Sequence, residues 1–281
     1  MPTSPKDKVK ALLFDVFGTV VDWRGSTIRE LTSFGRGRGL EADWTKFADE
    51  WRGLYQPAME EVRNGRRQWT ILDDLHRESL VKLLEQHGIR GLNAHEIEDL
   101  NTIWHRLDPW PDTVSGLQRL KSRYIIGTLS NGNIGLLSRM AKRAGLPWDV
   151  VLGAEPVRAY KPLPECYRGN AALLNLEPHE VMLVAAHNGD LKAASNAGLR
   201  TGFVVRPSEF GPGQTIDLGA SEGRRDVPLA LRPDFTLPRA IFTLVGPFLF
   251  RLLRSRPHPH LLGGDTENFP RVGLHNQRRV N

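Results

Sequence analysis

The chain has 281 residues, 40% of them hydrophobic and 25% charged, proportions that are ordinary for a soluble globular protein with room for one large domain or two smaller ones. Its formal net charge is +6, of which residues 251–281, with six arginines and two acidic residues, contribute +4. Residues 1–250 therefore carry only +2 and lack the strongly basic charge of a protein that binds polyanions. We expect no nucleic-acid partner. The single cysteine excludes an intrachain disulfide. The first residues are charged, which argues against a signal peptide, and no apolar run reaches the roughly 18 residues of a membrane span. These features together favour a cytoplasmic protein.

The first predicted strand lies at residues 10–17, where the apolar run Leu12–Leu13–Phe14 is ended by Asp15. Such a run is typical of a buried parallel strand. About 85 residues follow, 26–110, whose apolar spacing predicts amphipathic helices and no strand. These helices are expected at 41–62, 70–88 and 95–107. An insertion of this kind predicts a second, helical domain over the strand ends.

Strand-like runs recur in the second half of the chain, at residues 124–131, 150–156, 181–188 and 200–206. Helical patterns lie between the later runs, and the first of them closes on Gly145, a good C-terminal stop. Strands that alternate with helices predict a mostly parallel sheet with crossover connections, an α/β fold. The predicted domains are a core from 8–24 and 111–238, a helical cap at 25–110, and a partly disordered C-terminal extension at 239–281.

A polar or charged residue stands at or shortly after the end of each of the first four predicted strands: Asp15, Ser130, Lys161 and Asp190. Each alone could be a helix cap or a solvated side chain. Because the ends of neighbouring parallel strands meet at one edge of a sheet, we expect the four to share a pocket. A lysine about 4 Å from Asp15 would attract it by roughly 4 kcal/mol at an effective dielectric near 20, enough to keep a half-buried carboxylate ionised. Such a carboxylate is a nucleophile.

Five motifs, DVFGTVVDWR, TLSNGN, YKPLPECY, VAAHNGDL and RPSEFGP, together resemble the type II (L-2-haloacid) dehalogenases of the haloacid dehalogenase superfamily. The resemblance covers roughly residues 8–213. It implies a Rossmann-like parallel sheet core with an inserted helical cap domain, no metal or organic cofactor, and a homodimer. The implied reaction converts short-chain L-2-haloalkanoic acids to 2-hydroxy acids with inversion, through an aspartyl ester.

The resemblance also implies a role for individual residues. Asp15 would attack the halogen-bearing carbon, and Asp190 would orient or activate water against the ester while Lys161 stabilises charge. Thr19 and Ser130 would hydrogen-bond the nucleophile and the substrate carboxylate. The remaining site residues that it implies are Arg52 and Asn131, which match the halide-receiving residues, Tyr167 and Asn188, which join the catalytic set, and Val16, Phe17 and His187, which line the substrate and halide site.

Other readings stay open at this point. A phosphatase of the same superfamily would need a second aspartate two residues after Asp15, where this chain has Phe17, and a further acid after Asp190, where Leu191 and Ala194 stand instead. Another hydrolase, or a weakly active member kept for binding through its basic tail, remains an alternative. Gly189, in place of the family's aromatic residue, leaves the halide preference open, as does His187, which stands where some members have asparagine.

Overall fold

The computed structural model describes residues 9–212, Gln214 and the backbone of 227–228; the predicted C-terminal extension lies outside the described residues. A five-stranded sheet has the order β4-β1-β5-β6-β7, and every neighbouring pair is parallel. Its strands are β1 (Ala11–Phe14), β4 (Ile125–Thr128), β5 (Val181–Ala185), β6 (Arg200–Phe203) and β7 (Val227–Pro228). The expected α/β fold with a parallel sheet is confirmed.

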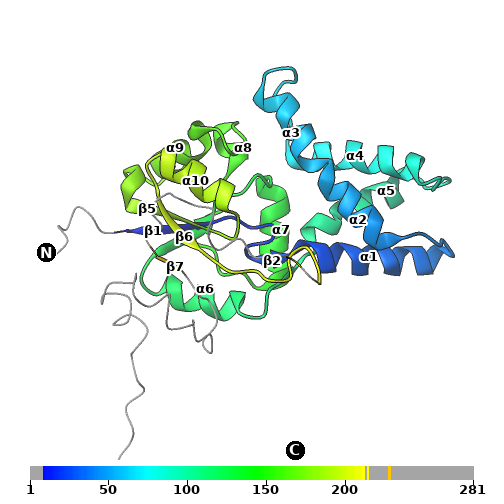
Figure 1. Ribbon diagram of the computed structural model, residues 1–281, viewed down its shortest axis with the longest axis horizontal. Helices are drawn as coiled ribbons and strands as arrows, with labels where there is room; N and C mark the ends of the chain where they lie inside the picture. Colours follow the sequence, from blue (N-terminus) through cyan, green and yellow to red (C-terminus); the bar gives the residue numbers. More distant parts are fainter. Residues whose placement is uncertain (1–8, 213, 215–226, 229–281) are drawn as a thin grey trace, which may run out of the picture. The chain divides into compact units, whose positions relative to one another are not determined.

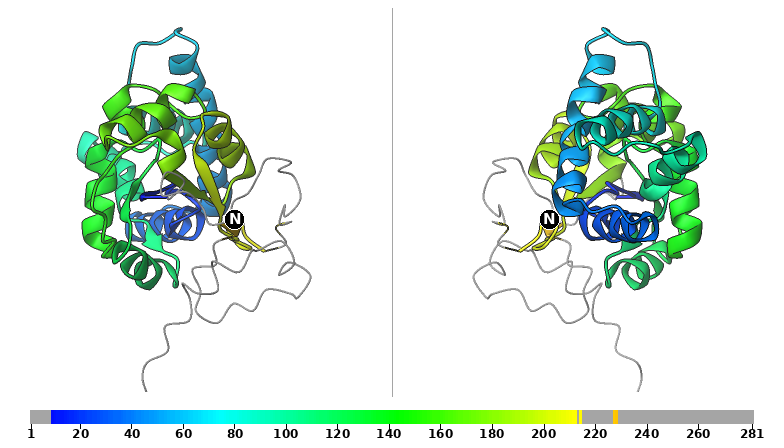
Figure 2. Two further views of the ribbon diagram at one scale, coloured as in Figure 1. Left: turned by 90° about the vertical axis from the view of Figure 1, so that its left-hand side faces the viewer. Right: turned by 90° about the vertical axis from the view of Figure 1, so that its right-hand side faces the viewer.

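Helices cover both faces of this sheet (Figures 1 and 2). Alternate residues of β1 point to opposite faces: Phe14 packs in one apolar cluster with Leu117 and Leu136, while Leu13 packs in the other with Cys166 and Leu191. The helices of the core are α6 (Thr113–Lys121), α7 (Ile134–Ala144), α8 (Ala154–Val157), α9 (Pro164–Leu173), η3 (Pro178–Glu180) and α10 (Asn188–Asn196). As predicted, α7 ends at Gly145, which takes a left-handed conformation with φ of 67°.

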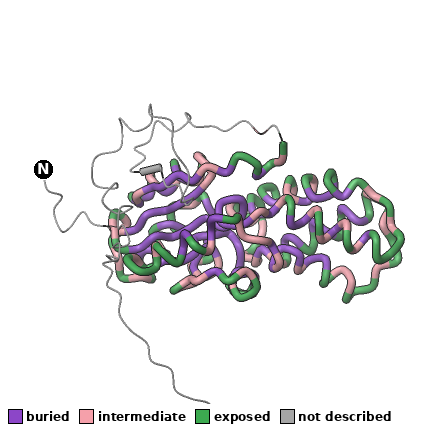
Figure 3. The backbone as a smooth tube through the Cα atoms, turned by 90° about the horizontal axis from the view of Figure 1, so that it is seen from below, coloured by how far each residue is buried: buried purple, intermediate pink, exposed green. Residues whose placement is uncertain are grey.

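The insertion after β1 is helical, as expected, and lies beyond the ends of the strands (Figure 1). Its elements are α1 (Trp23–Arg38), α2 (Trp44–Gly53), α3 (Tyr55–Arg63), α4 (Leu72–Gln86), α5 (Ala94–Asn101) and η2 (Thr102–His105). Figure 3 shows mostly buried residues along the strands of the sheet, whereas the inserted helices alternate between buried and exposed residues.

Three details of the insertion differ from the prediction. The 16-residue helix α1 lies outside the three ranges expected to be helical. The single helix expected at 41–62 is two helices that meet at Leu54, because Pro57 has no N–H and its ring crowds the carbonyl of Gly53, the last residue of α2. The segment expected to hold no strand contains β3 (Asp108–Pro109), which pairs antiparallel with β2 (Val21–Asp22) at the two ends of the insertion. A two-residue strand is too short to produce a periodic pattern.

The strand expected at 150–156 is also wrong. Only two isolated bridges form there, Gly127 to Val150 and Ser130 to Gly153. The Thr128 hydroxyl donates to the Leu152 carbonyl at 2.6 Å and accepts from its N–H at 3.0 Å, so a side chain interrupts the backbone ladder between the two bridges. A helical turn, α8, begins directly after Gly153.

Hydrogen bonds join the inserted helices to the loops that follow the strands. The Asn133 amide at the start of α7 donates to Asp73 Oδ2 of α4 at 2.9 Å. The Tyr160 hydroxyl donates to the carbonyl of Thr70 at 2.7 Å, and Arg63 Nη1 of α3 donates to the Lys161 carbonyl at 2.9 Å. These bonds hold the helical insertion against the carboxyl ends of the strands.

A buried ion pair joins the loop after β6 to the start of α6, and the same arginine contacts the turn after β1. Arg206 Nη1 donates to both oxygens of Asp112 at 2.8 and 3.0 Å, and its Nε donates to the Thr19 carbonyl at 2.8 Å. The Arg206 and Asp112 side chains are only 6% and 5% exposed. Removing one member of such a pair leaves the other charge buried without compensation.

We therefore expect Asp112→Ala to lower the free energy of unfolding by about 3–5 kcal/mol, measured by urea denaturation. Asp99→Ala is the matched control, because the Asp99 side chain is 61% exposed where it pairs with Arg106; its effect should stay within about 0.5 kcal/mol. Equal effects of the two variants would show that the buried pair does not stabilise the fold.

Candidate active site

Asp15 follows β1 directly and is held there by its N–H, which donates to the Val184 carbonyl of β5 at 3.0 Å. Its side chain is 10% exposed. Oδ1 accepts from Lys161 Nζ at 2.9 Å, and Oδ2 accepts from the Thr19 hydroxyl at 2.8 Å and from His187 Nδ1 at 3.1 Å. One carboxylate thus gathers residues from three parts of the chain that are far apart in sequence.

Lys161 lies between two carboxylates. Besides Asp15, its Nζ contacts Asp190 Oδ2 at 2.5 Å, and Asp190 Oδ1 accepts from the Tyr167 hydroxyl at 2.6 Å. The Lys161 N–H donates to Asn131 Oδ1 at 2.9 Å, which fixes the backbone of this loop. The structure therefore brings Asp15, Lys161 and Asp190 together, as the strand-end argument predicts.

These charges hold one another in the ionised form. Burial by itself would raise the pKa of Asp15, but the Lys161 ammonium and then the His187 ring lower that pKa well below its usual range. Burial would likewise lower the pKa of Lys161, but Asp15 and Asp190 raise it above its usual value. At neutral pH the site contains an ionised carboxylate beside an ionised lysine.

The other residues predicted for the site are distributed around this cluster. The Ser130 hydroxyl accepts from the Gly132 N–H at 3.1 Å, whereas the hydrogen bonds to Asp15 within the described chain come from Thr19, Lys161 and His187. Val16 is buried next to Asp15, and its carbonyl accepts from the N–H groups of residues 20 and 21. Asn188 is the first residue of α10 and is half-buried.

An aromatic wall with a cation in it faces the cluster. The Arg52 guanidinium carbon, from α2, lies 4.1 Å from the ring centroid of Tyr55, 5.3 Å from that of Trp23 and 5.9 Å from that of Phe17. Phe17 also packs edge-on against Trp104 at 5.8 Å. Arg52 Nη1 is buried with no hydrogen-bond partner among the described residues. A desolvated donor of this kind fits a small anion.

Glu209, which lies in the motif RPSEFGP but is not among the residues predicted for the site, contacts His187. It is 2% exposed, and both carboxylate oxygens lie 3.0 Å from His187 Nε2. Trp23 Nε1 donates to it at 3.1 Å. Gly18, with φ of 88°, leaves room for it, since a Cβ there would come within 2.0 Å of Glu209 Oε1. A glutamate in a loop containing proline and glycine is ordinarily exposed, and no local signal marks this one as buried.

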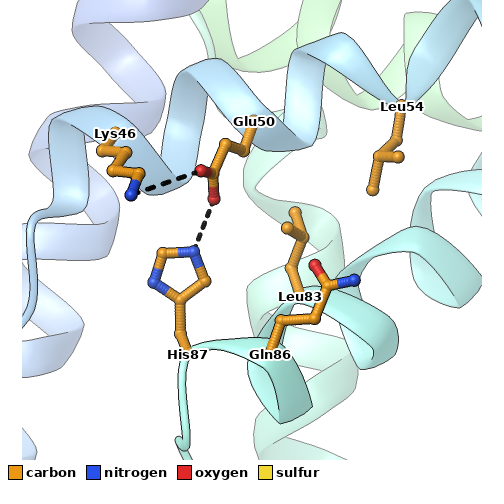
Figure 4. Close-up of a pocket in the computed structure, with 6 residues that line it drawn as sticks. All are labelled: Lys46, Glu50, Leu54, Leu83, Gln86 and His87. Atoms are coloured by element: carbon orange, nitrogen blue, oxygen red, sulfur yellow. Dashed lines mark hydrogen bonds and ion pairs between the residues drawn. The ribbon is translucent and has the colours of Figure 1, made fainter.

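A separate cavity of about 420 Å³ lies in the helical insertion, lined by Lys46, Glu50, Leu54, Leu83, Gln86 and His87. Figure 4 shows Lys46 and His87 directed at Glu50; the His87 Nε2–Glu50 Oε2 distance is 2.6 Å. None of the sequence-predicted site residues lines this cavity. The cluster around Asp15 is therefore the candidate active site.

Within the described part of the chain, no three His, Cys, Asp or Glu side chains are grouped so that they could hold a metal ion. No helix there is both long enough and apolar enough to span a membrane.

Comparisons with known proteins agree on one family. A model of the haloacid dehalogenase-like hydrolases matches residues 9–198. (S)-2-haloacid dehalogenase 4A of Burkholderia cepacia is 27% identical over 225 residues, covering 73% of this chain and 87% of the relative. The solved structure of the defluorinating L-2-haloacid dehalogenase Rha0230 is 48% identical, covers 80% of this chain and 93% of its own, and superimposes with a TM-score of 0.77. The L-2-haloacid dehalogenase from Xanthobacter autotrophicus, solved with chloropropionic acid covalently bound, is 25% identical and covers 70% and 77%, with a TM-score of 0.61.

Proposed function

This chain belongs to the haloacid dehalogenase-like hydrolases, and we propose that it is a hydrolytic dehalogenase that converts short-chain L-2-haloalkanoic acids to 2-hydroxy acids with inversion. The observation that carries the proposal is the buried, ionised Asp15 with Lys161 Nζ at 2.9 Å, together with the Arg52 guanidinium among aromatic rings, whose Nη1 has no hydrogen-bond partner in the described part of the chain. Relatives named for this activity include one 48% identical over most of its length.

In the first step, Asp15 displaces the halide. Oδ2 already accepts two hydrogen bonds and Oδ1 only one, so Oδ1 keeps the more available lone pair for attack. A bond forms from Oδ1 to carbon 2 of the substrate, the carbon–halogen bond breaks, and its electron pair leaves with the halide. Attack from behind the leaving group inverts the carbon.

In the second step, water hydrolyses the aspartyl ester. Asp190 is held by Tyr167 on one oxygen and by Lys161 on the other, and it takes a proton from a water that adds to the Asp15 carbonyl carbon. The tetrahedral adduct then collapses, the ester oxygen leaves on carbon 2, and the proton on Asp190 passes to it as the product hydroxyl. Lys161 stabilises the negative charge of Asp190 throughout, and that of Asp15 before alkylation and after hydrolysis.

The departing halide is assigned to Arg52 and Asn131. Arg52 presents a buried Nη1 with no partner in the described residues, and its guanidinium lies over three aromatic rings. The amide of Asn131 lies beside the Lys161 backbone. Phe17 and Val16 form the apolar side of the site, and Ser130 is assigned to the substrate carboxylate. These roles, like the homodimer, the cytoplasmic location and the division into core and cap, are part of the proposal.

A phosphatase reaction fits these residues poorly. The position two residues after Asp15 is Phe17, buried against Trp104 and Tyr55, so no second aspartate can protonate a phosphate leaving group there. Leu191 and Ala194, on the turn after Asp190, are both buried in the apolar cluster of the core. Neither supplies the additional oxygen ligand that a magnesium ion prefers.

A substrate panel tests the proposal. We expect L-2-chloropropionate to release chloride and yield D-lactate. D-2-chloropropionate should react at least roughly 100-fold more slowly, because its opposite configuration at carbon 2 directs the halogen away from Arg52 and Asn131. Activity in excess EDTA should stay within about twofold of that without it. Phosphate release from phosphate monoesters that requires Mg²⁺, with no halide release from any 2-haloacid, would instead identify a phosphatase.

A further inference from the structure

His187 lies between two carboxylates at the edge of the site. Its Nδ1 is 3.1 Å from Asp15 Oδ2, and its Nε2 is 3.0 Å from both oxygens of Glu209. The Glu209 side chain is 3% exposed and that of His187 is 30% exposed. Trp23 Nε1 also donates to Glu209 Oε1, at 3.1 Å. The imidazole is thus oriented by a buried carboxylate and directed at one oxygen of the nucleophile.

The two carboxylates favour the charged ring. A neutral imidazole has one N–H and would turn a lone pair toward one of the carboxylates, whereas the protonated ring donates to both. Burial by itself would lower the pKa of His187, but its hydrogen bonds to Asp15 and Glu209, and their charges, raise it to about 10. Beyond Asp15 lie Lys161 and Asp190, which form their own pair.

Thr19 provides a second donor to the same oxygen. Its hydroxyl accepts from the Ala186 N–H at 2.9 Å, so its single hydrogen points to Asp15 Oδ2 at 2.8 Å. Oδ2 therefore receives one hydrogen from a hydroxyl and one from a cationic ring. Once Oδ1 has been alkylated, Oδ2 is the carbonyl oxygen of the ester, and it becomes an oxyanion when water adds to the carbonyl carbon.

We propose that His187 and Thr19 form the oxyanion-binding pair for hydrolysis of the aspartyl ester, and that Glu209 is the positioning residue that keeps the His187 ring oriented and protonated. The inference rests on the proposed function. The electron pair of the carbonyl moves to Oδ2 when the water oxygen bonds to carbon, and it returns when the ester oxygen leaves; His187 keeps its proton throughout. This role differs from the halide-site role that the sequence resemblance implies for His187.

The charges in the two steps predict opposite effects of His187. Asp15 loses its negative charge during alkylation, so a neighbouring cation gives no help to that step. During hydrolysis, negative charge appears on Oδ2 from a neutral ester, so the same cation stabilises the transition state more than the ground state. His187 therefore accelerates the second step selectively.

Rapid-quench kinetics with L-2-chloropropionate separate the two steps. We expect His187→Ala to lower steady-state kcat roughly 100–1,000-fold, yet to release chloride in a burst of about one equivalent per enzyme at a rate close to that of the native chain. Mass spectrometry should then show the intact protein carrying the ester. His187→Asn, which keeps a neutral donor near Asp15, should retain more of kcat than His187→Ala; it also serves if the alanine variant does not fold.

Glu209→Gln tests the positioning role through its pH profile. Without the Glu209 charge the pKa of His187 in the ester falls, so the protonated ring is lost at lower pH and the alkaline limb of the kcat profile should move to lower pH. His87→Ala is the matched control, because His87 forms a histidine–glutamate pair with Glu50 at 2.6 Å in the helical insertion. It should show native kcat, no ester and an unchanged alkaline limb.

Three results would overturn the proposal. The first is loss of the chloride burst in both His187 variants, which would place His187 in alkylation or halide binding. The second is a kcat of His187→Ala within about twofold of the native value. The third is an alkaline limb of the kcat profile that does not move in Glu209→Gln. Failure of the proposed function is distinguishable, because the native chain itself would then release no halide.

Discussion

Asp15→Asn is expected to reduce halide release from L-2-haloacids by roughly 10⁴-fold or more, the scale seen when enzymes with covalent intermediates lose their nucleophile. An amide oxygen is a poor nucleophile and cannot form the ester, although it fills the same space beside Lys161 and Thr19. Steady-state chloride release at saturating substrate measures the loss. Asp49→Asn is the control: Asp49 pairs with Arg24 and its side chain is 44% exposed, so turnover should not change.

An isotope experiment checks that Asp15 is the attacking group. In a single turnover in H₂¹⁸O with enzyme in excess, the product hydroxyl should carry no label, because its oxygen comes from the Asp15 carboxylate. The label should appear in the protein, at Asp15, after digestion and mass spectrometry. Label in the product hydroxyl under these conditions means direct attack by water, and the nucleophile assignment would then be wrong.

Lys161→Met is expected to lower both activity and stability. The alternative that Lys161 is a solvated side chain is excluded, because its side chain is 7% exposed between two carboxylates that are 10% and 12% exposed. Removing the ammonium leaves both charges buried without compensation. We expect activity to fall roughly 100–1,000-fold and the free energy of unfolding at pH 7 to fall by about 3–5 kcal/mol.

The pH dependence of that destabilisation follows from the signs of the shifts. The lowered pKa of Asp15 contributes stability above its ordinary value of 3.8, and the raised pKa of Lys161 contributes stability below its ordinary value of 10.5. Urea denaturation should therefore show the largest difference between native chain and variant from about pH 5 to 9, shrinking as the pH falls below about 4. Lys46→Met, at a side chain 64% exposed, should show almost no difference. A pH-independent loss in Lys161→Met would mean that lost packing, not charge, is responsible.

Local patterns were sufficient for much of the core. The apolar run before Asp15 predicts β1 because a strand buried on both faces needs apolar residues at every position. The grouping of Asp15, Lys161 and Asp190 follows from topology alone, since parallel strands deliver their carboxyl ends to one edge. The strand predicted at 150–156 failed because a side chain, Thr128, interrupts the backbone ladder there, and hydrophobicity carries no trace of such an interruption.

By itself the sequence determined the α/β class, the helical insertion, the family, and the grouping of Asp15 with Lys161 and Asp190. Only the tertiary structure decided the surroundings of Asp15. The Trp23–Glu209 bond joins residues 186 positions apart, and His187 reaches Asp15 across 172. Local periodicity reports which face of a helix or strand is buried, not which distant side chain meets it. Glu209, which local composition would place in solvent, is buried where a histidine and an indole N–H from other parts of the chain hydrogen-bond to it.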